Sequence, residues 1–357
     1  MAGVCPRRLL SKCGTFLLPR ACPVKTSSQR IKLIVPPELS GQRLDRFLVS
    51  RLTDLSRTRI QSLMEEGFVQ VSGAAMKPSY RVETGDNVTV EIPRLEAAGV
   101  QAEPIALDVL CEDEHLAVIN KPAGMIIHPG AGADSGTMVA ALLNRFGGIE
   151  GLSTVGGPLR PGIVHRLDKG TSGAVVIART DAAHRKLVEA FQQRTVQKTY
   201  LALLHGRLRA DTGTIDLPVS RDLRRRARMT ARRREGREAR TDWRVLLRLD
   251  GFTFVEAALH TGRTHQIRVH FSALGCPVVG DTLYGAPRQE RIGTELLPAL
   301  DRNFLHAARL AFGHPATGKQ LEMRAPLPPE LVEYARALAR ATQANGDIID
   351  ASLQEFL

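Results

Sequence analysis

Apolar residues from position 31 onward follow strand and helix spacings that divide the chain into segments. Residues 31–35 ("IKLIV") alternate as in a strand, and the leucines and phenylalanine of 44–52 share one helical stripe. A second helix is expected from a Ser56 cap to Gly67, followed by short strands around a turn. This pattern predicts that residues 31–93 form one compact helix–helix–strand unit.

The longer remainder of the chain mixes strand-like and helical runs without a regular strand–helix–strand rhythm. A helix is expected over residues 182–196, and strands are expected at 173–180, 198–208 and 252–260. Residues 107–130 are expected to supply two strands on either side of the Pro122-Ala-Gly turn. This mixture favours an α+β fold with a mostly antiparallel sheet.

These segments predict the domain organisation. Residues 94–107 indicate a linker, because Ala, Gly, Pro and two acids follow one another without periodicity. A final helix is expected from Pro328-Pro329 to Asn345-Gly346. The expected parts are an N-terminal extension (1–30), a small domain (31–93), the linker (94–107), a large domain (108–327), and a C-terminal helix with a tail (328–357).

Composition indicates a folded protein with a polyanionic partner. Apolar residues make up 43% and charged residues 24%, which argues against wholesale disorder. The formal net charge is +12, and residues 1–30 supply half of it, with six Lys or Arg and no acid. The other half lies in the body of the chain, so nucleic acid is the expected partner, ahead of an anionic membrane surface. Since no run of about 18 apolar residues is present, no membrane span is expected.

The most basic segment is residues 221–240, with ten Arg against three acids. The strand-like runs on both sides predict that it is the extended loop of a hairpin. Its candidate phosphate contacts are Arg224, Arg225 and Arg226, which would give salt-dependent and largely sequence-independent RNA affinity. A solvated loop is the alternative. The aromatic content of 4% limits base stacking as a source of that affinity.

Residues 1–30 are basic and interrupted by three prolines, and they are left out of the fold prediction. Their composition fits an organelle transit peptide, which makes a mitochondrion or plastid the alternative to a bacterial-type cytoplasmic location. An unstructured bacterial extension or a misassigned start codon also explains them. The five cysteines form no Cys-x-x-Cys pair, so neither a zinc site nor a disulfide framework is expected, and a reducing compartment is favoured.

Three stretches resemble cofactor motifs only in part. Residues 313–320 ("GHPATGKQ") begin as a phosphate-binding loop does, but Gln320 and a strand-like run replace the required Ser or Thr and helix. Residues 130–136 ("GAGADSG") are one position too long for a dinucleotide fingerprint. His265 and His270 are five apart, which does not match zinc ligands on one helical face. We therefore expect no metal and no other cofactor.

A stronger candidate site combines "HRLDKGTSG" (165–173) with a helix expected after Thr264. Thr264 is a good N-cap and Gly275 a good helix end, which puts Arg268 in the first turns. The helix dipole disfavours a cation there unless an anion lies close by, and Asp168 is a candidate for that anion. An Arg beside an Asp lowers the pKa of the carboxyl. An ionised, partly buried Asp168 can act as a nucleophile, and a purely structural ion pair is the alternative.

Several of these segments together resemble one enzyme family. "HRLDKGTSG", with "INKPAGMIIHPG" upstream and "GRTHQIRVH" and "LGCPVVGDTLYG" downstream, is similar to the RluA/RluD-type pseudouridine synthases over about residues 107–327. "HPGAGADSGTMVAALL" is closer to the RluD subgroup. Residues 31–93 resemble the S4 type of RNA-binding domain, with Arg57 and Arg59 of the second helix as candidate RNA contacts. The resemblance implies a pseudouridine synthase fold, preceded by a small α/β RNA-binding domain, and RNA of the large ribosomal subunit as substrate.

The family's site residues carry over to four positions of this chain. Asp168 matches the catalytic Asp, which adds to the target uridine while its glycosidic bond breaks; attack on carbon 6 of the base and on carbon 1′ of the ribose both stay open. Tyr200 matches the Tyr that stacks on the base and transfers a proton, Arg268 the partner of the Asp, and Arg166 the residue that holds the place of the flipped nucleotide. The implied reaction is isomerisation of uridine in RNA, which needs no cofactor because it involves no net oxidation. The enzyme is expected to be a monomer. The alternative is a non-catalytic RNA-binding or ribosome-assembly factor with the same fold.

Overall fold

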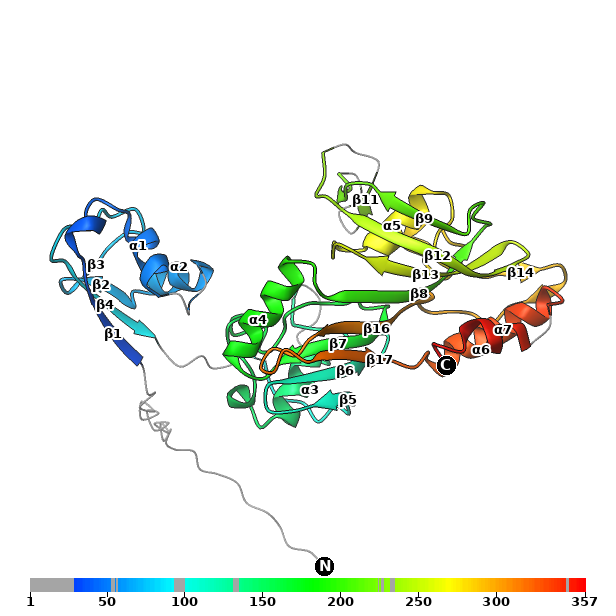
Figure 1. Cartoon of the computed structure of the whole chain (residues 1–357), viewed down its shortest axis with the longest axis horizontal. Helices are drawn as coiled ribbons and strands as arrows, with labels where there is room; N and C mark the ends of the chain where they lie inside the picture. Colours follow the sequence, from blue (N-terminus) through cyan, green and yellow to red (C-terminus); the bar gives the residue numbers. More distant parts are fainter. Residues whose placement is uncertain are drawn as a thin grey trace, which may run out of the picture. The chain divides into compact units, whose positions relative to one another are not determined.

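A computed structural model divides the chain into two compact units, one with residues up to 51 and 60–94 and the other with residues 52–59 and 95–357. The described residues are 29–52, 55, 57–92, 100–130, 135–223, 225, 228–231, 235–344 and 347–357, without the side chains of Gln29, Arg57 and Thr58. None of the helices in these ranges is long and apolar enough to cross a membrane. Figure 1 shows the elements of each unit.

The small unit has the predicted helix–helix–strand pattern. Helices α1 (Leu44–Arg51) and α2 (Arg57–Glu65) bury their apolar stripes, and a short 3-10 turn, η1 (Pro37–Leu39), precedes them. Gly67 follows α2 with a φ of +83°, the left-handed conformation typical of a helix end. The expected Ser56 cap lies outside the described residues. The strands run in the order β1-β4-β2-β3 and are β1 (Gln29–Ile34), β2 (Val69–Val71), β3 (Ala74–Ala75) and β4 (Asn87–Ile92).

The large unit is built on one mixed sheet, which has nine strands within its described residues (Figure 1). The order is β5-β6-β7-β16-β8-β13-β12-β9, with β17 beside β16, and all pairs are antiparallel except β7 with β16. This confirms the predicted α+β fold with a mostly antiparallel sheet. The strands are β5 (Asp108–Glu112), β6 (Leu116–Lys121), β7 (Ser172–Ala178), β8 (Gln197–His205), β9 (Thr212–Asp216), β12 (Arg240–Leu249), β13 (Phe252–Leu259), β16 (Leu305–Gly313) and β17 (Gln320–Arg324).

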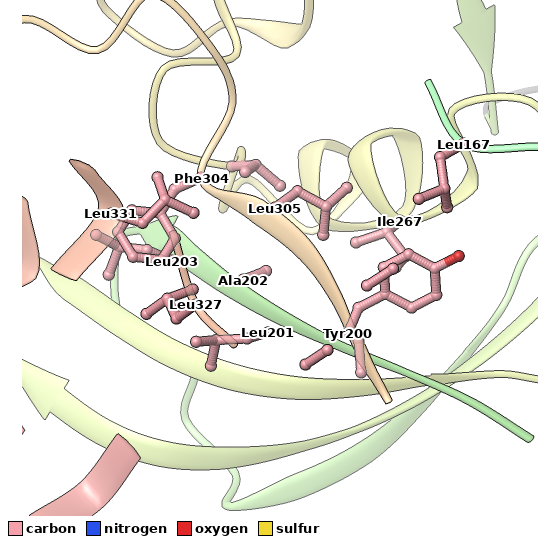
Figure 2. Close-up of a cluster of buried hydrophobic side chains, with 14 of the residues drawn as sticks. Leu167, Tyr200, Leu201, Ala202, Leu203, Ile267, Phe304, Leu305, Leu327 and Leu331 are labelled. Carbon is pink, nitrogen blue, oxygen red and sulfur yellow. The ribbon is translucent and has the colours of Figure 1, made fainter. Parts of the chain in front are cut away.

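Helices cover this sheet and bury its central strands. All seven residues of β7 are buried, as expected for a central strand that is covered on both faces. Helix α4 (Asp181–Gln192) packs against β7, and α5 (Gln266–Ala273) packs against β12. Figure 2 shows part of the resulting core, where leucines of β8 meet Phe304 and Leu331. The remaining elements of this region are α3 (Met138–Arg145), η2 (Ile149–Gly151), η3 (Thr282–Tyr284), β14 (Arg291–Ile292) and β15 (Glu295–Leu296).

The strand pair predicted around the Pro122 turn is wrong in position. β5 and β6 pair before that turn, and the chain reverses at Asp113. The Asp113 carboxylate accepts the backbone N–H groups of His115 (2.7 Å) and Leu116 (2.9 Å), so it closes the hairpin without a glycine. After Lys121 the chain leaves the sheet, and the backbone carbonyls of residues 126–127 bond to the start of α3 instead.

The arginine-rich segment lies between β9 and β12, which pair antiparallel, so the predicted hairpin is confirmed. Inside it, β10 (Ser220–Arg221) and β11 (Met229–Thr230) form a second, small ladder. Arg225 is exposed, whereas Arg224 and Arg226 lie outside the described residues.

The C-terminal region contains a second helix in place of the expected tail. Helix α6 (Pro329–Ala341) begins at the predicted Pro329 and ends before the predicted stop. Helix α7 (Asp347–Leu353) follows and packs against β12. Ile349 and Leu353 are 0% exposed, so burial of this short apolar face against the sheet, not local propensity, explains the helix.

Candidate active site

Asp168 lies on the turn that leads into β7, and its carboxylate is free of that turn. The turn is held by backbone groups: the Thr171 N–H donates to the Asp168 carbonyl (3.1 Å), and the Gly124 N–H donates to the Lys169 carbonyl (2.8 Å). Among the described residues, the hydrogen bond made by the Asp168 carboxylate is with Arg268. The side chain is 18% exposed, so it is partly buried and still accessible. Asp168 therefore does not act as an ordinary turn residue.

Arg268 on α5 is shared between two carboxylates. Its Nε and Nη2 donate to the two oxygens of Asp281 at 2.6 and 2.9 Å, while Nη1 donates to Asp168 Oδ2 at 3.2 Å. Burial disfavours the charged guanidinium, but its bonds to Asp281, and then the charge of Asp168, raise the pKa of Arg268. Two carboxylates and one guanidinium leave a net charge of −1. The ion pair expected between Arg268 and Asp168 is present, and it leaves Asp168 only partly neutralised.

The expected N-cap of this helix is wrong. Helix α5 begins after His265, whose φ of +57° is uncommon for a residue with a side chain. The Gln266 side chain accepts the backbone N–H of Arg263 (3.0 Å), and so a side chain inside the helix organises the approach to it, in place of Thr264. The predicted end is confirmed, because Gly275 has a φ of +77°.

The left-handed backbone turns His265 toward the site. Its Nε2 lies 3.8 Å from Asp168 Oδ2, and its Nδ1 lies 2.8 Å from the Tyr284 hydroxyl. That hydroxyl accepts the Met229 N–H (2.9 Å), which favours donation of its own proton to Nδ1. Burial lowers the pKa of His265, so the ring is neutral at physiological pH. The Arg268 guanidinium also lies over the Tyr284 ring, 5.0 Å from its centroid, in a cation–π contact.

Tyr200 faces the site from β8. Its ring packs with Leu167, Ile267 and Leu305, and Figure 2 shows the hydroxyl pointing away from the core leucines. The side chain is buried, and both this burial and the negative charge of Asp168 raise the pKa of the phenol. The phenol is therefore protonated at physiological pH.

Asp168, Tyr200, Arg268 and Arg166 line one cavity, together with residues 262–267. A second cavity of about 540 Å³ continues from it along residues 126–130 and 166–170. Arg166 is exposed and lines both. The structure thus brings the four candidate residues of the large unit together. The other candidates lie elsewhere: Arg59 is half-buried on α2, the side chain of Arg57 is not described, and Arg225 is in the hairpin loop.

Lys121, at the end of β6, is a residue that sequence reasoning missed. Its ammonium donates to the carbonyls of Pro122 (2.7 Å), Met125 (2.9 Å) and Lys169 (3.4 Å), and the residue is 0% exposed. Burial and then Arg302 lower the pKa of Lys121 to about 7, against the opposing effect of Asp168. Lys121 ties the Pro122 turn to the residue next to Asp168. The sequence signal that could have identified this residue is a lysine directly at the end of an apolar strand.

Lys121→Met is expected to destabilise the large unit by about 2–4 kcal/mol, because three carbonyls lose the buried donor that holds them together. The measurement is the midpoint of urea unfolding, read together with pseudouridine formation. Lys319→Met is the matched control, because Lys319 is an exposed lysine of the same unit. Equal midpoints for the two variants would show that the carbonyls find other partners.

Asp281 is the second residue that was missed, although "GDTLYG" contains it. It is 3% exposed and holds Arg268 through both carboxylate oxygens.

Asp281→Asn removes one acceptor and the charge, so Arg268 is no longer held with Nη1 toward Asp168. We expect kcat to fall about tenfold or more, which is about 1.4 kcal/mol of activation free energy, with little change in the KM for RNA. A raised KM with an unchanged kcat would contradict this positioning role.

Comparison with known proteins agrees with this geometry. The chain matches the RNA pseudouridylate synthase family over residues 115–273 and the S4 domain over residues 42–88. It is 42% identical over 313 residues to the uncharacterized RNA pseudouridine synthase YlyB of Bacillus subtilis, covering 87% of this chain and 99% of that protein. It is 40% identical over 297 residues to ribosomal large subunit pseudouridine synthase D of Zymomonas mobilis, covering 82% of this chain and 93% of that one.

A solved structure supports the fold. Human RNA pseudouridylate synthase domain containing 1 is 30% identical, with a TM-score of 0.50, over 64% of this chain and 88% of that protein.

The fold, the carboxylate beside a cavity and the S4 unit together define an RNA-modifying enzyme. The chain belongs to the RluA/RluD-type family of RNA pseudouridine synthases, with an N-terminal S4 domain. It is therefore an RNA pseudouridine synthase, and the alternative of a non-catalytic factor of the same fold is set aside.

Proposed function

We propose that this enzyme isomerises uridines of large-subunit ribosomal RNA, with Asp168 as the nucleophile. The observation that carries the proposal is the partly neutralised Asp168 carboxylate, held by Arg268 at the wall of a cavity that Tyr200 also lines. The ribosomal substrate is supported by relatives such as ribosomal large subunit pseudouridine synthase D of Vibrio parahaemolyticus, which is 38% identical over 312 residues.

The proposed chemistry rearranges bonds within one nucleotide. The Asp168 carboxylate adds to the target uridine, at carbon 6 or carbon 1′, and the bond between carbon 1′ and N1 breaks. The base turns, carbon 5 bonds to carbon 1′, and the bond to Asp168 breaks, which regenerates the carboxylate. Carbon 5 loses its proton, and N1 gains one. The product has the same atoms as the substrate, so no external reductant or oxidant takes part.

The charges at the site give Tyr200 a role in the later proton step. The negative charge of Asp168 is one of the causes that raise the pKa of Tyr200. Once Asp168 is covalently bonded, this charge is gone and the phenol loses its proton more readily. We propose that Tyr200 then assists removal of the proton from carbon 5, while its ring stacks on the base. Arg268 and His265 stabilise the carboxylate when it is released.

The RNA surface is proposed to extend over both units. The S4 unit (31–93), with Arg57 and Arg59, would hold the RNA, and the synthase unit (108–327) would act on it. The target uridine must leave its stack, at a free-energy cost of a few kcal/mol. Arg166 is exposed and lines both cavities, and we propose that it fills the vacated position. The bacterial relatives support a cytoplasmic location for the enzyme, which we propose acts as a monomer.

The substrate proposal is tested by mapping pseudouridine in total RNA from cells that lack this protein. We expect specific sites to be lost from large-subunit ribosomal RNA and restored by the wild-type protein, but not by Asp168→Ala. Loss confined to transfer or messenger RNA would overturn the ribosomal assignment and leave the enzyme class intact. Restoration by Asp168→Ala would overturn the role of Asp168.

The arginines of the β10–β11 loop provide a separate prediction. Replacing Arg224, Arg225 and Arg226 together with Ala is expected to weaken RNA binding and to flatten its salt dependence, by about 0.7–0.9 in the log–log slope for each lost phosphate contact. Binding of the wild type and the triple variant is compared across a salt series. An unchanged slope would mean that these side chains are solvated in the complex.

A further inference from the structure

A third cavity, also of about 540 Å³, borders Tyr200 and extends to residues that have no part in the chemistry above. It lies between α4, the start of β8 and the loop after β13. It shares Arg166, Tyr200 and Arg263 with the lining of the cavity at Asp168, so the two cavities adjoin at these side chains. We call it the α4 groove, after the helix that supplies Val188, Phe191 and Gln192 to its wall.

The lining of the α4 groove is strongly cationic. Arg166, Arg194, Lys198 and Arg263 all reach it, and among its lining residues, all of them described, there is no Asp or Glu. Arg194 pairs with Glu238 at 2.9 and 3.0 Å just outside the lining. Burial and then the charges of Arg237 and Arg194 lower the pKa of Arg263, against the opposing effect of Glu238, so these cations repel one another. Glu238 offsets part of this repulsion from outside the lining, and an anion inside the groove would offset the rest.

Lys198 is the clearest case, because it is half-buried and its ammonium has no acidic partner in the described part of the chain. Among the described residues, no carboxylate is within ion-pair distance of the ammonium, and its recorded contact is the Phe191 ring, 5.9 Å away. Burial and then Arg194 lower the pKa of Lys198 to about 8. A half-buried cation without a partner destabilises a fold. Its presence therefore indicates a ligand.

The position of Lys198 relates the groove to the reacting nucleotide. Lys198 and Tyr200 are two apart on β8, so their side chains stand on the same face, about 7 Å apart along the strand. That separation suits a phosphate next to a base that lies against Tyr200. Lys and Arg offer only donors, which match phosphate oxygens and carry no base specificity.

We propose that the α4 groove binds the RNA backbone beside the target uridine, with Lys198, Arg194 and Arg263 holding a flanking phosphate. This rests on the proposed placement of the target uridine beside Asp168 and Tyr200. The apolar wall of Val164, Val188 and Phe191 then packs against the adjoining ribose. Because phosphate contacts position RNA without reading its bases, the groove fixes where the strand enters the site, not which uridine is chosen.

The test measures binding in the Asp168→Ala background, so that it does not depend on turnover. The probe is the stem-loop of large-subunit ribosomal RNA that carries the uridine mapped for the wild-type protein. Lys198→Met is compared with Lys319→Met, an exposed lysine of the same unit. Arg194→Met is compared with Arg336→Met, because both break an exposed ion pair, with Glu238 and with Asp350 respectively. Each variant is measured over a salt series and by thermal unfolding.

We expect Lys198→Met and Arg194→Met each to raise the Kd about tenfold and to lower the salt slope by about 0.7, while both controls stay at the wild-type value. Lys198→Met is also expected to unfold at the same temperature as the wild type or higher, since it removes an unanswered charge. A Kd and slope equal to those of the controls would overturn the groove assignment. Pseudouridine formation by the protein with Asp168 intact is measured in a separate assay. A failure of the proposed function is therefore distinguished from a failure of the groove proposal.

A second series locates the phosphate. Each phosphate flanking the target uridine is replaced in turn by a neutral methylphosphonate. One position is expected to weaken binding about tenfold in the protein with Lys198, and to have no further effect in Lys198→Met. If every position weakens both proteins equally, Lys198 does not contact the backbone near the target and the proposal fails.

Discussion

Asp168→Asn is expected to release no tritium from RNA labelled at carbon 5 of uridine, a loss of at least about a thousandfold in kcat/KM. Asn keeps the size of the side chain and an oxygen that can accept from Arg268, so the pocket retains its shape. What is lost is the negative charge and the nucleophilic oxygen. The Kd for RNA is expected to change little, because Asp168 contributes no phosphate-binding group.

Asp211→Asn is the control for this result. Asp211 is an exposed carboxylate of the same unit, and its side chain pairs with Arg248 at 2.6 Å. This variant is expected to release tritium at the wild-type rate. If Asp168→Asn also did so, the carboxylate would be a structural partner of Arg268, and the nucleophile would have to be sought elsewhere.

Tyr200→Phe is expected to lower kcat by about a hundredfold to ten thousandfold, the usual range for removal of a proton-transfer group. The ring, its packing on Ile267 and its stacking surface remain, and no hydrogen bond of the hydroxyl is recorded among the described residues. Folding and RNA affinity are therefore expected to be unchanged. Rates of pseudouridine formation under single-turnover conditions, with a parallel RNA-binding curve, measure both quantities.

Tyr334→Phe provides the matched control, since Tyr334 is a buried tyrosine of α6 with a similarly raised pKa, caused by burial and Glu290. Its conversion to Phe is expected to leave kcat unchanged. A wild-type kcat in Tyr200→Phe would restrict Tyr200 to stacking and assign the proton at carbon 5 to another group. A raised Kd with an unchanged kcat would instead make Tyr200 a binding residue.

The two aspartates that pair with Arg268 show where prediction from sequence succeeds and where it fails. The ion pair with Asp168 was expected, because a cation in the first turns of a helix calls for an anion. The closer pair, with Asp281, was not expected. Both aspartates lie in family-like segments, but spacing along the chain does not say which oxygen an arginine reaches.

The elements that were predicted wrongly were also decided by contacts that the local sequence pattern does not show. The β5–β6 hairpin closes on the Asp113 side chain, which replaces the glycine that a turn pattern would show. Helix α7 forms because the sheet covers Ile349 and Leu353, although the local sequence has no strong helix signal. Thr264 had the right residue type for a cap, but the left-handed His265 moved the helix start beyond it.

The sequence by itself determined most of the helices and strands, the two-unit organisation and the identity of Asp168 as the residue to test. These depend on patterns that act over a few neighbouring residues. Only the tertiary structure decided that Arg268, a hundred positions from Asp168, binds two aspartates. It also decided that Lys198 lines the α4 groove without a carboxylate partner among the described residues. The reason is physical: such contacts depend on which strands become neighbours in the sheet, and β7, β16 and β8 are adjacent there without being consecutive in the chain.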